Sequence, residues 1–419
     1  MKSFFTACAV CGSLDAQPLF PSFFRGQVSS AQMIVICRRC GLVYRNPHIP
    51  DICADHYEDV GSWEGEHIYI ERLRGVAERI ASHVRLEAGD LSLEIGCGPG
   101  WLAEHLHAIF PDAGAVLLEP SLKVAEHAQR RNPHAAVLPG VLADADVPQG
   151  RFACVIVCAV DYLFQHHRKD MERIHGLLRD GGTLYIERNV FIDQRALTKR
   201  PIFDIEDLFG LNHRMNTWFG REQFLEYLGQ FFDLTDVVQY VSDVTPAPYS
   251  RQNLVTGVFA RKRPQGARQA PPPLTNRYEE HVNLLRTIAL ESTLQDLRLL
   301  AGSGIRRVAI CGAGDEARLA ATLIRNNGLF SIAGFASLGA GAKSEADRLT
   351  QQFASGNPSA PVDAYLVASI AEADQFVAEL TAMGCQNVLR CFRPGLPTAW
   401  DDGGTIQLKA MLPAYLRAA

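Results

Sequence analysis

Four cysteines near the start of the chain form two pairs with the same spacing, Cys8-Ala-Val-Cys11 and Cys37-Arg-Arg-Cys40. A CxxC pair lets two sulfur atoms from one tight turn point at the same ion, and four thiolates can complete the tetrahedral shell of Zn²⁺. Gly12 and Gly41 follow the pairs directly, where the backbone must turn sharply. The alternatives are four unligated thiols or a redox pair, but neither pair opens a helix after a strand as redox motifs do. The spacing therefore predicts a closed, structural zinc site with these four cysteines as ligands.

A second group of residues that could do chemistry surrounds a glycine-rich turn. The sequence predicts a buried strand at Leu91–Ile95, the turn itself, and a helix that begins at Trp101. Glycines let the backbone of such a turn approach a ligand, and the N-terminus of the helix offers free N–H groups. Glu94 can reach the amino-acid portion of a zwitterionic ligand. The next strand ends about 20 residues after the turn in Glu119, where a carboxylate can accept hydrogen bonds from ribose hydroxyls.

The spacing of the turn is GxGxG, and not the GxGxxG of dinucleotide-binding proteins. The segment resembles motif I of the class I, S-adenosylmethionine-dependent methyltransferases, and the resemblance extends over roughly residues 65–262. Further segments follow in the order of that family: a strand and loop at 137–144, a buried run at Phe152–Cys158, and a helix end, Gly-Gly turn and strand at 177–187. Strand patterns that alternate with helix patterns are typical of a parallel sheet with helices on its faces.

The resemblance implies which residues hold the cofactor. The methionine portion would be lined by Glu94, Gly96, Gly98 and Gly100, with Cys97 and Pro120 also among the cofactor-binding residues. Glu119 would hold the ribose, Leu142 would flank the adenine, and Cys158 or Ala159 would lie under the sulfonium. The sulfonium is already a strong methyl donor. The protein must therefore hold the acceptor in line, exclude water and take up a proton where needed.

The acceptor side carries a second resemblance. A zinc module, a methyltransferase and a second α/β domain, in this order, resemble the sugar C-methyltransferases that act on deoxysugar nucleotides. That family carries a Tyr-His-Glu-His stretch before an aromatic pair, and the corresponding stretch here is residues 212–219. Only His213 keeps its type, because Arg214 and Met215 occupy the positions of the glutamate and the second histidine. This departure leaves open a different acceptor or a different reaction on a similar one.

Several side chains could act as the base that removes a proton from the acceptor. An imidazole with a pKa near neutrality can take a hydroxyl proton during O-methylation. Asp161 directly follows the strand Phe152–Cys158, a position where acceptors often lie. The predicted catalytic residues are His213, Asp161 and His166, and His167 and Glu187 are further candidates. The alternative is that some of them only satisfy backbone groups or face solvent.

The last part of the chain predicts another α/β domain. A strand pattern that begins at Arg306 leads into Gly312-Ala-Gly-Asp-Glu-Ala317 and a helix, which by itself suggests a dinucleotide-binding fingerprint. The next strand ends in Ser337 and lacks the ribose-binding acid. An NAD(P)-dependent oxidoreductase is therefore the alternative function. The domain is expected instead to help clamp a nucleotide-linked acceptor, or only to pack against the catalytic domain.

Length and composition agree with a multidomain globular protein. The 419 residues exceed the usual size of one core, 47% of them are hydrophobic, and the net charge of −5 gives no reason to expect nucleic acid as a partner. No run of about 18 apolar residues suggests a membrane span, and the cysteine pattern indicates a reducing compartment, so a cytoplasmic protein is expected. A homodimer is possible.

The sequence thus predicts an α/β protein with a Rossmann-like methyltransferase sheet, an N-terminal four-cysteine zinc module and a C-terminal second Rossmann-like α/β domain. The predicted boundaries are 1–60 for the zinc module, 61–262 for the methyltransferase domain, 263–303 for a linker and helix, and 304–419 for the C-terminal domain. The predicted function is methyl transfer from S-adenosylmethionine to a small-molecule acceptor, either a sugar nucleotide or a related biosynthetic intermediate. A non-catalytic scaffold with a degenerate cofactor fold is a further alternative.

Overall fold

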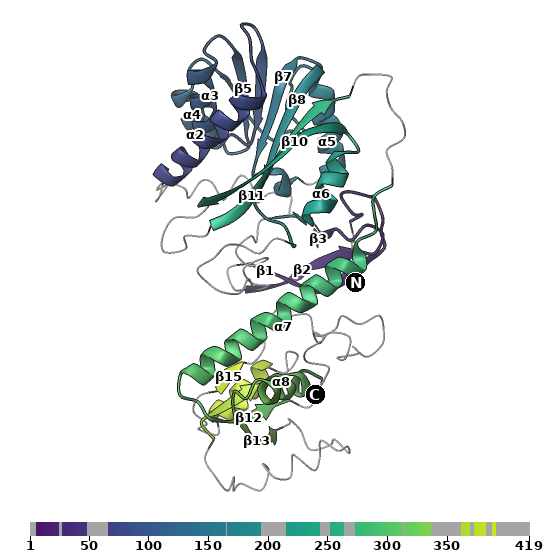
Figure 1. Cartoon of the computed structure of the whole chain (residues 1–419), viewed down its shortest axis with the longest axis vertical. Coiled ribbons are helices and arrows are strands. Elements are labelled where there is room, and N and C mark those ends of the chain that lie inside the picture. Colours follow the sequence, from purple (N-terminus) through teal and green to yellow (C-terminus); the bar gives the residue numbers. More distant parts are fainter. Residues whose placement is uncertain are drawn as a thin grey trace. The chain divides into compact units, whose positions relative to one another are not determined.

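The chain forms two compact units, which are described separately (Figure 1). Unit 1 comprises Met1–Gln17, Gln32–Pro201 and Asn212–His281, and unit 2 comprises Pro18–Ala31, Ile202–Leu211 and Val282–Ala419. The computed structural model describes residues 6–24, 27–47, 66–164, 166–193, 215–243, 252–263, 273–312, 315–336, 362–368, 373–382 and 388–390.

A seven-stranded sheet forms the centre of unit 1, with the strand order β10-β11-β8-β7-β4-β5-β6. The strands are β4 (Leu91–Ile95), β5 (Gly114–Glu119), β6 (Ala136–Pro139), β7 (Phe152–Cys158), β8 (Leu178–Arg188), β10 (Phe232–Asp243) and β11 (Gln252–Lys262). The central strand β7 is an unbroken apolar run and is buried along nearly its whole length, as expected for a strand that is covered on both faces. The predicted strands at Leu91–Ile95 and Phe152–Cys158 are confirmed.

The sheet departs from the expected parallel arrangement at one strand, because β11 runs antiparallel to both β8 and β10. The connection from Asp243 to Gln252 is shorter than the crossover of about a dozen residues that parallel neighbours need. The predicted Gly-Gly turn before the fifth strand lies inside β8, where Gly181 has a φ of 72° and the register with β7 shifts.

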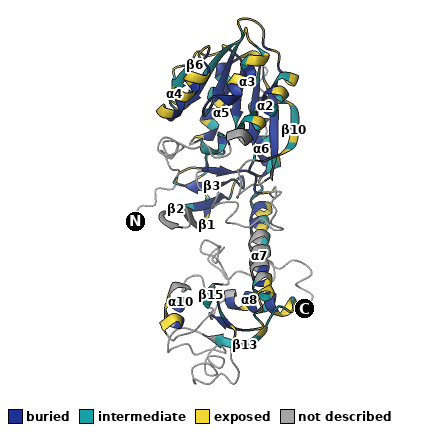
Figure 2. Cartoon of the chain, turned by 90° about the vertical axis from the view of Figure 1, so that its left-hand side faces the viewer, coloured by how far each residue is buried: buried dark blue, intermediate teal, exposed yellow. Residues whose placement is uncertain are grey.

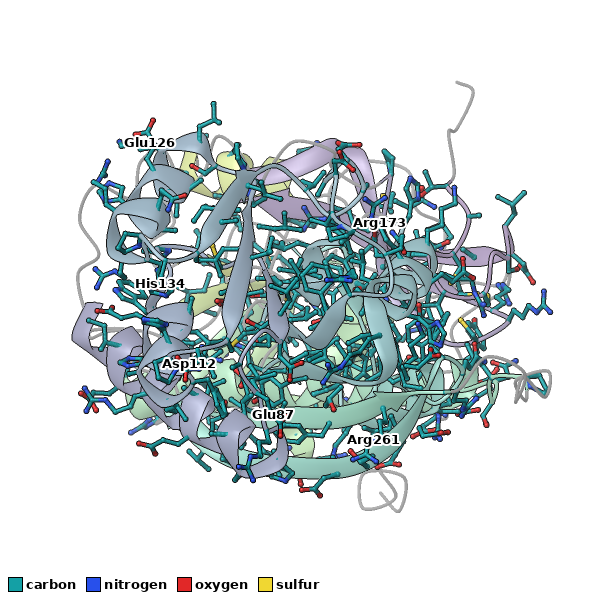
Figure 3. The ribbon with its side chains drawn as sticks, turned by 90° about the horizontal axis from the view of Figure 1, so that it is seen from above. Glu87, Asp112, Glu126, His134, Arg173 and Arg261 are labelled. Carbon is teal, nitrogen blue, oxygen red and sulfur yellow. The ribbon has the colours of Figure 1, made fainter. Side chains whose placement is uncertain are left out.

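Helices cover both faces of this sheet (Figure 1). One face carries α2 (Glu66–His83), α3 (Trp101–Ile109) and α4 (Leu122–Arg131), and the other carries α5 (His167–Leu177) and α6 (Arg221–Leu228). The side chain of Ser121 caps α4 by accepting the N–H of Val124, and two arginines in its last turn complement the helix dipole. Exposed residues lie on the outer faces of α2, α3 and α4 (Figure 2), where charged side chains such as Glu126 point outward (Figure 3).

A smaller sheet with the order β1-β2-β3-β9 carries the cysteine pairs. Its strands are β1 (Ala16–Phe24), β2 (Gln27–Cys37), β3 (Val43–Asn46) and β9 (Thr217–Trp218). Cys37 ends β2, Cys40 lies in the turn that leads to β3, and the first pair precedes β1. The partner of β3 on its other side is β9, which comes from the methyltransferase part of the sequence. The residues around the two cysteine pairs, here called the cysteine region, therefore share a core with the seven-stranded sheet in unit 1.

Unit 2 is built on four parallel strands in the order β13-β12-β14-β15. They are β12 (Arg307–Cys311), β13 (Ser331–Ala336), β14 (Ala364–Val367) and β15 (Val388–Arg390), and the helices are α7 (Tyr278–Gly302), α8 (Asp315–Asn326) and α10 (Ala373–Ala382). Residues of α7 and α8 pack on one face of the sheet, and residues of α10 pack on the other. This layering agrees with the α/β type expected for this region. Among the described helices of the whole chain, none is long and apolar enough to cross a membrane.

Candidate active site

The glycine loop, defined as residues 96–100, connects β4 to α3 at the carboxyl end of the sheet. The N–H groups of Gly96 and Cys97 donate to Leu118 O on β5, at 2.8 and 3.0 Å, which fixes the start of the loop. Gly98 has a φ of 54°, and a Cβ atom added there would meet nothing within 4 Å. The loop therefore exposes backbone to open space directly before the N-terminus of a helix, where N–H groups are free to bind a ligand.

Gly100 shows why the end of the loop must be glycine. Its φ is 81°, and a Cβ atom there would lie 2.3 Å from Asn132 Nδ2. The same nitrogen donates to Gly100 O at 2.9 Å and to Ala128 O at 3.1 Å, so Asn132 holds the loop against α4. The loop conformation is thus fixed by the protein before any ligand binds.

Glu119 lies at the end of β5 and faces the glycine loop. Its carboxylate accepts the N–H groups of Gly98 and Ser121, each at 3.0 Å, and the residue is 3% exposed. Burial raises the pKa of Glu119, while these two backbone hydrogen bonds act in the opposite direction. In the described part of the chain, no lysine or arginine pairs with this acid. A carboxylate with two oxygens can accept further hydrogen bonds, so Glu119 remains able to bind hydroxyl groups of a ligand.

Glu94 is the second acid beside the loop. Burial, and then the charge of Glu119, raise the pKa of Glu94 to about 8. Its Oε2 atom is buried and has no hydrogen-bond partner. The residue also lines a cavity of about 20 Å³ between α3, β4 and β5, which is large enough for a single water molecule. A buried acid without a partner favours binding of a positively charged group beside it.

The remaining predicted cofactor residues lie at neighbouring strand ends. Cys97 is buried within the loop, Pro120 follows β5, and Leu142 is buried in the main core after β6. Cys158 ends β7, where its thiol donates to Glu187 Oε1 at 3.5 Å. Ala159 has a φ of 53°, which is unusual for a residue other than glycine and is often found at functional sites. The parallel strands therefore bring Glu94, Glu119, the glycine loop and Cys158 together at the carboxyl end of the sheet.

The predicted base Asp161 belongs to a buried group of residues, the Asp161 cluster, made of Asp161, His167, Arg188 and Tyr227. Arg188 forms an ion pair with Asp161, and both side chains are fully buried. His167 Nε2 donates to Asp161 Oδ2 at 3.2 Å, which leaves Nδ1 to accept from the Tyr227 hydroxyl at 3.3 Å. Burial alone would raise the pKa of Asp161, but the charge of Arg188 and the bond from His167 hold it below its usual value. Because Arg188 and His167 already engage its carboxylate, Asp161 is suited to hold neighbouring residues in position.

The candidate Glu187 lies in a second buried group, the Glu187 cluster. Arg72 on α2 forms an ion pair with Glu187 Oε1, and the hydroxyl groups of Tyr185 and Tyr240 donate to Oε2. With the thiol of Cys158, four donors surround this carboxylate. Both oxygens of this carboxylate are therefore already engaged by donors within the protein.

The other predicted bases are placed differently. His166 is exposed and immediately precedes α5, whereas its neighbour His167 is fully buried. His213 lies outside the described residues. Met215, at the second histidine position of the sugar C-methyltransferase pattern, is 1% exposed. The arginines that neutralise the strand-end acids, Arg72 and Arg188, were missed by sequence reasoning; the adjacent Glu187-Arg188 pair at the end of an apolar strand was the available signal.

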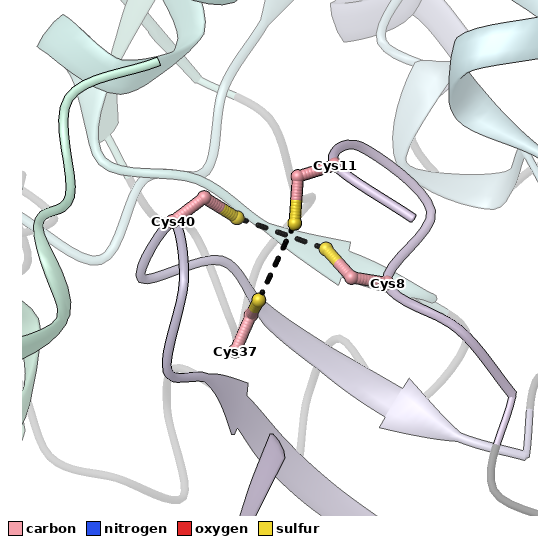
Figure 4. Close-up of side chains that lie close together, drawn as sticks. All are labelled: Cys8, Cys11, Cys37 and Cys40. Atoms are coloured by element: carbon pink, nitrogen blue, oxygen red, sulfur yellow. Dashed lines mark hydrogen bonds between the residues drawn. The ribbon is translucent and has the colours of Figure 1, made fainter. Parts of the chain in front are cut away.

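The four cysteines of the predicted metal site converge (Figure 4). Their sulfur atoms lie within 4.8 Å of one another, with 3.7 Å between Cys8 and Cys40 and 3.5 Å between Cys11 and Cys37. Tetrahedral Zn²⁺ with bonds of about 2.3 Å would separate its sulfur ligands by about 3.8 Å, so the arrangement fits this ion. The sulfur–sulfur hydrogen bonds lower the pKa of Cys11 and raise the pKa values of Cys8 and Cys40, so the four thiols share their protons when no metal is bound.

Comparisons with known proteins agree with the geometry of unit 1. Residues 66–239 match the family described as "Methyltransferase domain". The trans-aconitate 2-methyltransferase of Methylobacterium radiotolerans is 36% identical over 119 residues, which are 28% of this chain and 44% of the relative. The enzyme of the same name from Yersinia pestis is 35% identical over 81 residues, 19% of this chain and 29% of the relative. The chain thus spans less than half the length of these relatives.

Among solved structures, geranyl diphosphate C-methyltransferase from Streptomyces coelicolor A3(2) is similar over 49% of this chain and 86% of its own length, with 14% identity and a TM-score of 0.37. A score of this size does not decide the fold, which rests on the strand order and the family match. Residues 66–239 thus match a methyltransferase domain, and together with β11 and the end of β10 they form a Rossmann-like mixed sheet of seven strands.

Proposed function

We propose that the protein transfers a methyl group from S-adenosylmethionine to a small-molecule acceptor, either a sugar nucleotide or a related biosynthetic intermediate. The observation that carries this proposal is the pair of buried acids beside the glycine loop. Neither Glu94 nor Glu119 has a cationic partner among the described residues, and S-adenosylmethionine brings both a sulfonium and an ammonium group. Burial makes ionisation of Glu94 unfavourable in the free protein, so binding of a cation compensates part of that cost.

The residues of the loop and the strand ends divide the work of binding. Glu94 and the N–H groups of the glycine loop hold the methionine portion, and Glu119 accepts the ribose hydroxyls. Leu142 provides an apolar surface for the adenine, and Cys158 lies near the methyl group that is transferred. The bound cofactor supplies an electrophilic methyl group. The protein has to orient the acceptor, exclude water and accept a proton, and His213 and His166 are the proposed bases.

The cysteine region is proposed to hold a structural zinc ion. Its four sulfurs fit a closed shell, which leaves no open position for a substrate. The region is also joined to the methyltransferase domain by the N–H and Nε of Arg168, which donate to the carbonyls of Ala9 and Val10 at 3.1 and 3.0 Å. Gln223 on α6 donates to Cys40 O in the same way. The metal therefore stabilises one border of the methyltransferase domain.

Two observations support a small, anionic acceptor. The predicted domain order resembles that of sugar C-methyltransferases, whose acceptors carry phosphate groups. The curated relatives are named for trans-aconitate, a carboxylate. The proposal commits to a sugar nucleotide or a related intermediate and leaves the methylated atom open.

Binding of S-adenosylhomocysteine to the full-length protein, measured by calorimetry together with the zinc content, tests the proposed function. The methyl group of Gly98→Ala would project into the open space of the loop, so we expect binding to weaken by at least about tenfold. Gly89→Ala is the matched control, because Gly89 has a φ of 84°, also has nothing within 4 Å, and lies in the turn before β4. It imposes a similar backbone strain away from the loop and should leave binding unchanged.

Absence of binding to the wild-type protein would contradict the proposal. A parallel titration with NADH separates the alternatives. Binding of NADH alone would favour an oxidoreductase that uses residues 312–317, and binding of neither ligand would favour a scaffold.

A further inference from the structure

Arg45 on β3 is a buried cation that has no counter-charge among the residues the structure describes. The residue is 1% exposed, and the Nε atom of its side chain has no hydrogen-bond partner. Throughout the residues that the structure describes, no oxygen atom accepts a hydrogen bond from this guanidinium. The other fully buried strand arginine, Arg188, has Asp161 as its partner, and Arg72 has Glu187.

An unpaired buried guanidinium is unfavourable, because it has lost water and gained no anion in exchange. Burial lowers the pKa of Arg45 to about 10, so the group still carries its charge at neutral pH. The ring of Trp218 lies 5.9 Å from the guanidinium carbon and gives a cation–π contact, which offsets only part of the lost hydration. Among the described residues the Nε donor of this planar fork has no acceptor, so it can serve an anion from outside the chain.

Hydrogen bonds connect Arg45 to the part of the methyltransferase domain where the acceptor is expected to bind. Its backbone N–H donates to Asn216 O at 2.9 Å, next to the pairing of β3 with β9. Asn216 in turn donates its N–H to Tyr162 O at 2.7 Å and its side-chain amide to Leu163 O at 3.0 Å. Residues 161–163 form the turn that directly follows β7, where the acceptor is expected to lie. The oxygen of the Asn216 side chain is buried and also lacks a partner.

We infer that Arg45 binds an anionic group of the methyl acceptor, a phosphate or a carboxylate, at the junction of β3 and the turn after β7. This inference rests on the proposed function and adds the charge of the acceptor to it. A planar guanidinium matches either anion with two parallel hydrogen bonds. Asn216 fixes the strand position of Arg45 through the backbone hydrogen bond.

Thermal unfolding of the full-length, metal-containing protein tests the inference, with sodium phosphate, sodium succinate and sodium chloride compared at matched ionic strength. Phosphate and succinate are the two arms that distinguish the anion classes. The variant is Arg45→Met, which keeps much of the side-chain length without the charge. The control variant is Arg85→Met, at an exposed arginine in the turn between α2 and β4.

We expect phosphate or succinate, and not chloride, to raise the unfolding midpoint of the wild type and of Arg85→Met. The midpoint of Arg45→Met should not respond. Without anion, Arg45→Met should unfold at the same or a higher temperature than the wild type, because replacing an uncompensated buried charge by an apolar side chain is neutral or stabilising. Calorimetry should give Arg45→Met an unchanged affinity for S-adenosylhomocysteine.

An equal anion response in Arg45→Met would overturn the inference, as would a wild-type protein that responds to neither anion. A lower midpoint of Arg45→Met without anion would also overturn it, because the guanidinium would then have a structural role. None of these results depends on the affinity for S-adenosylhomocysteine. The same measurement therefore shows whether the proposed function fails separately.

Discussion

The acids at the carboxyl ends of neighbouring strands in the methyltransferase domain fall into two groups that differ in their partners. Glu94 and Glu119, beside the glycine loop, are buried, and neither pairs with a lysine or arginine among the described residues. Asp161 and Glu187, at the ends of β7 and β8, are buried against Arg188 and Arg72. The first group has raised pKa values, whereas the pKa of Asp161 is lowered by its arginine.

This difference separates binding residues from framework residues. A buried acid without a cation lowers the stability of the free protein and gains from a positively charged ligand. A buried acid with its own arginine has no such gain, and removal of either partner leaves a buried charge uncompensated. This criterion supports the proposal that Glu94 and Glu119 bind the cofactor and that Asp161 positions the end of β7.

The largest effect should come from breaking the paired group. Asp161→Asn leaves Arg188 buried opposite a neutral amide, so we expect the free energy of unfolding to fall by about 3–5 kcal/mol. Guanidinium denaturation followed by circular dichroism measures this change. Asp112→Asn at an exposed turn is the control and should stay within about 0.5 kcal/mol of the wild type. A loss as small as that of the control would place Asp161 outside the framework group.

Removal of an unpaired acid should weaken ligand binding and have little effect on the free energy of unfolding. Glu119→Ala removes the proposed acceptor of the ribose hydroxyls without leaving a buried cation unpaired, so the affinity for S-adenosylhomocysteine should fall by about tenfold to a hundredfold. The free energy of unfolding should change much less than in Asp161→Asn. Titration calorimetry measures the affinity, and Glu126→Ala on the outer face of α4 is the control (Figure 3). An affinity of Glu119→Ala for S-adenosylhomocysteine equal to that of the control would contradict the distinction between paired and unpaired acids.

The smallest effect, taken per pH unit, is the slope of the stability against pH. Glu94 has a pKa of about 8 in the folded protein and about 4.3 in an unfolded chain, so between these values the folded state binds more protons. The free energy of unfolding should therefore fall as the pH rises from about 4.3 to about 8, by up to about 1.4 kcal/mol per pH unit from this residue. Glu94→Gln should flatten the curve in this window. Superimposable curves for Glu94→Gln and the wild type would mean that Glu94 is ionised in the folded protein at neutral pH.

Local pattern was sufficient to predict the elements around the cofactor. The strand at Leu91–Ile95, the glycine turn and the helix beginning at Trp101 are all present, because glycine spacing and an apolar run of this length are properties of short segments. The convergence of the two CxxC pairs was also predictable, since each pair fixes two sulfurs locally. The direction of β11 was not, because strand pairing depends on the connection between distant segments.

Only the tertiary structure decided which charged residues face one another. The sequence offered Asp161, Glu187 and His167 as candidate bases, and nothing in their spacing indicated that Arg188 and Arg72 would reach two of them from β8 and α2. It also gave no sign that Arg45 would be buried with its Nε lacking a partner among the described residues. Residue types and spacing determine which chemistry the chain can perform, and burial and the partner across the fold decide which charge is already neutralised. The physical reason is that the cost of a buried charge depends on contacts between residues far apart in the sequence.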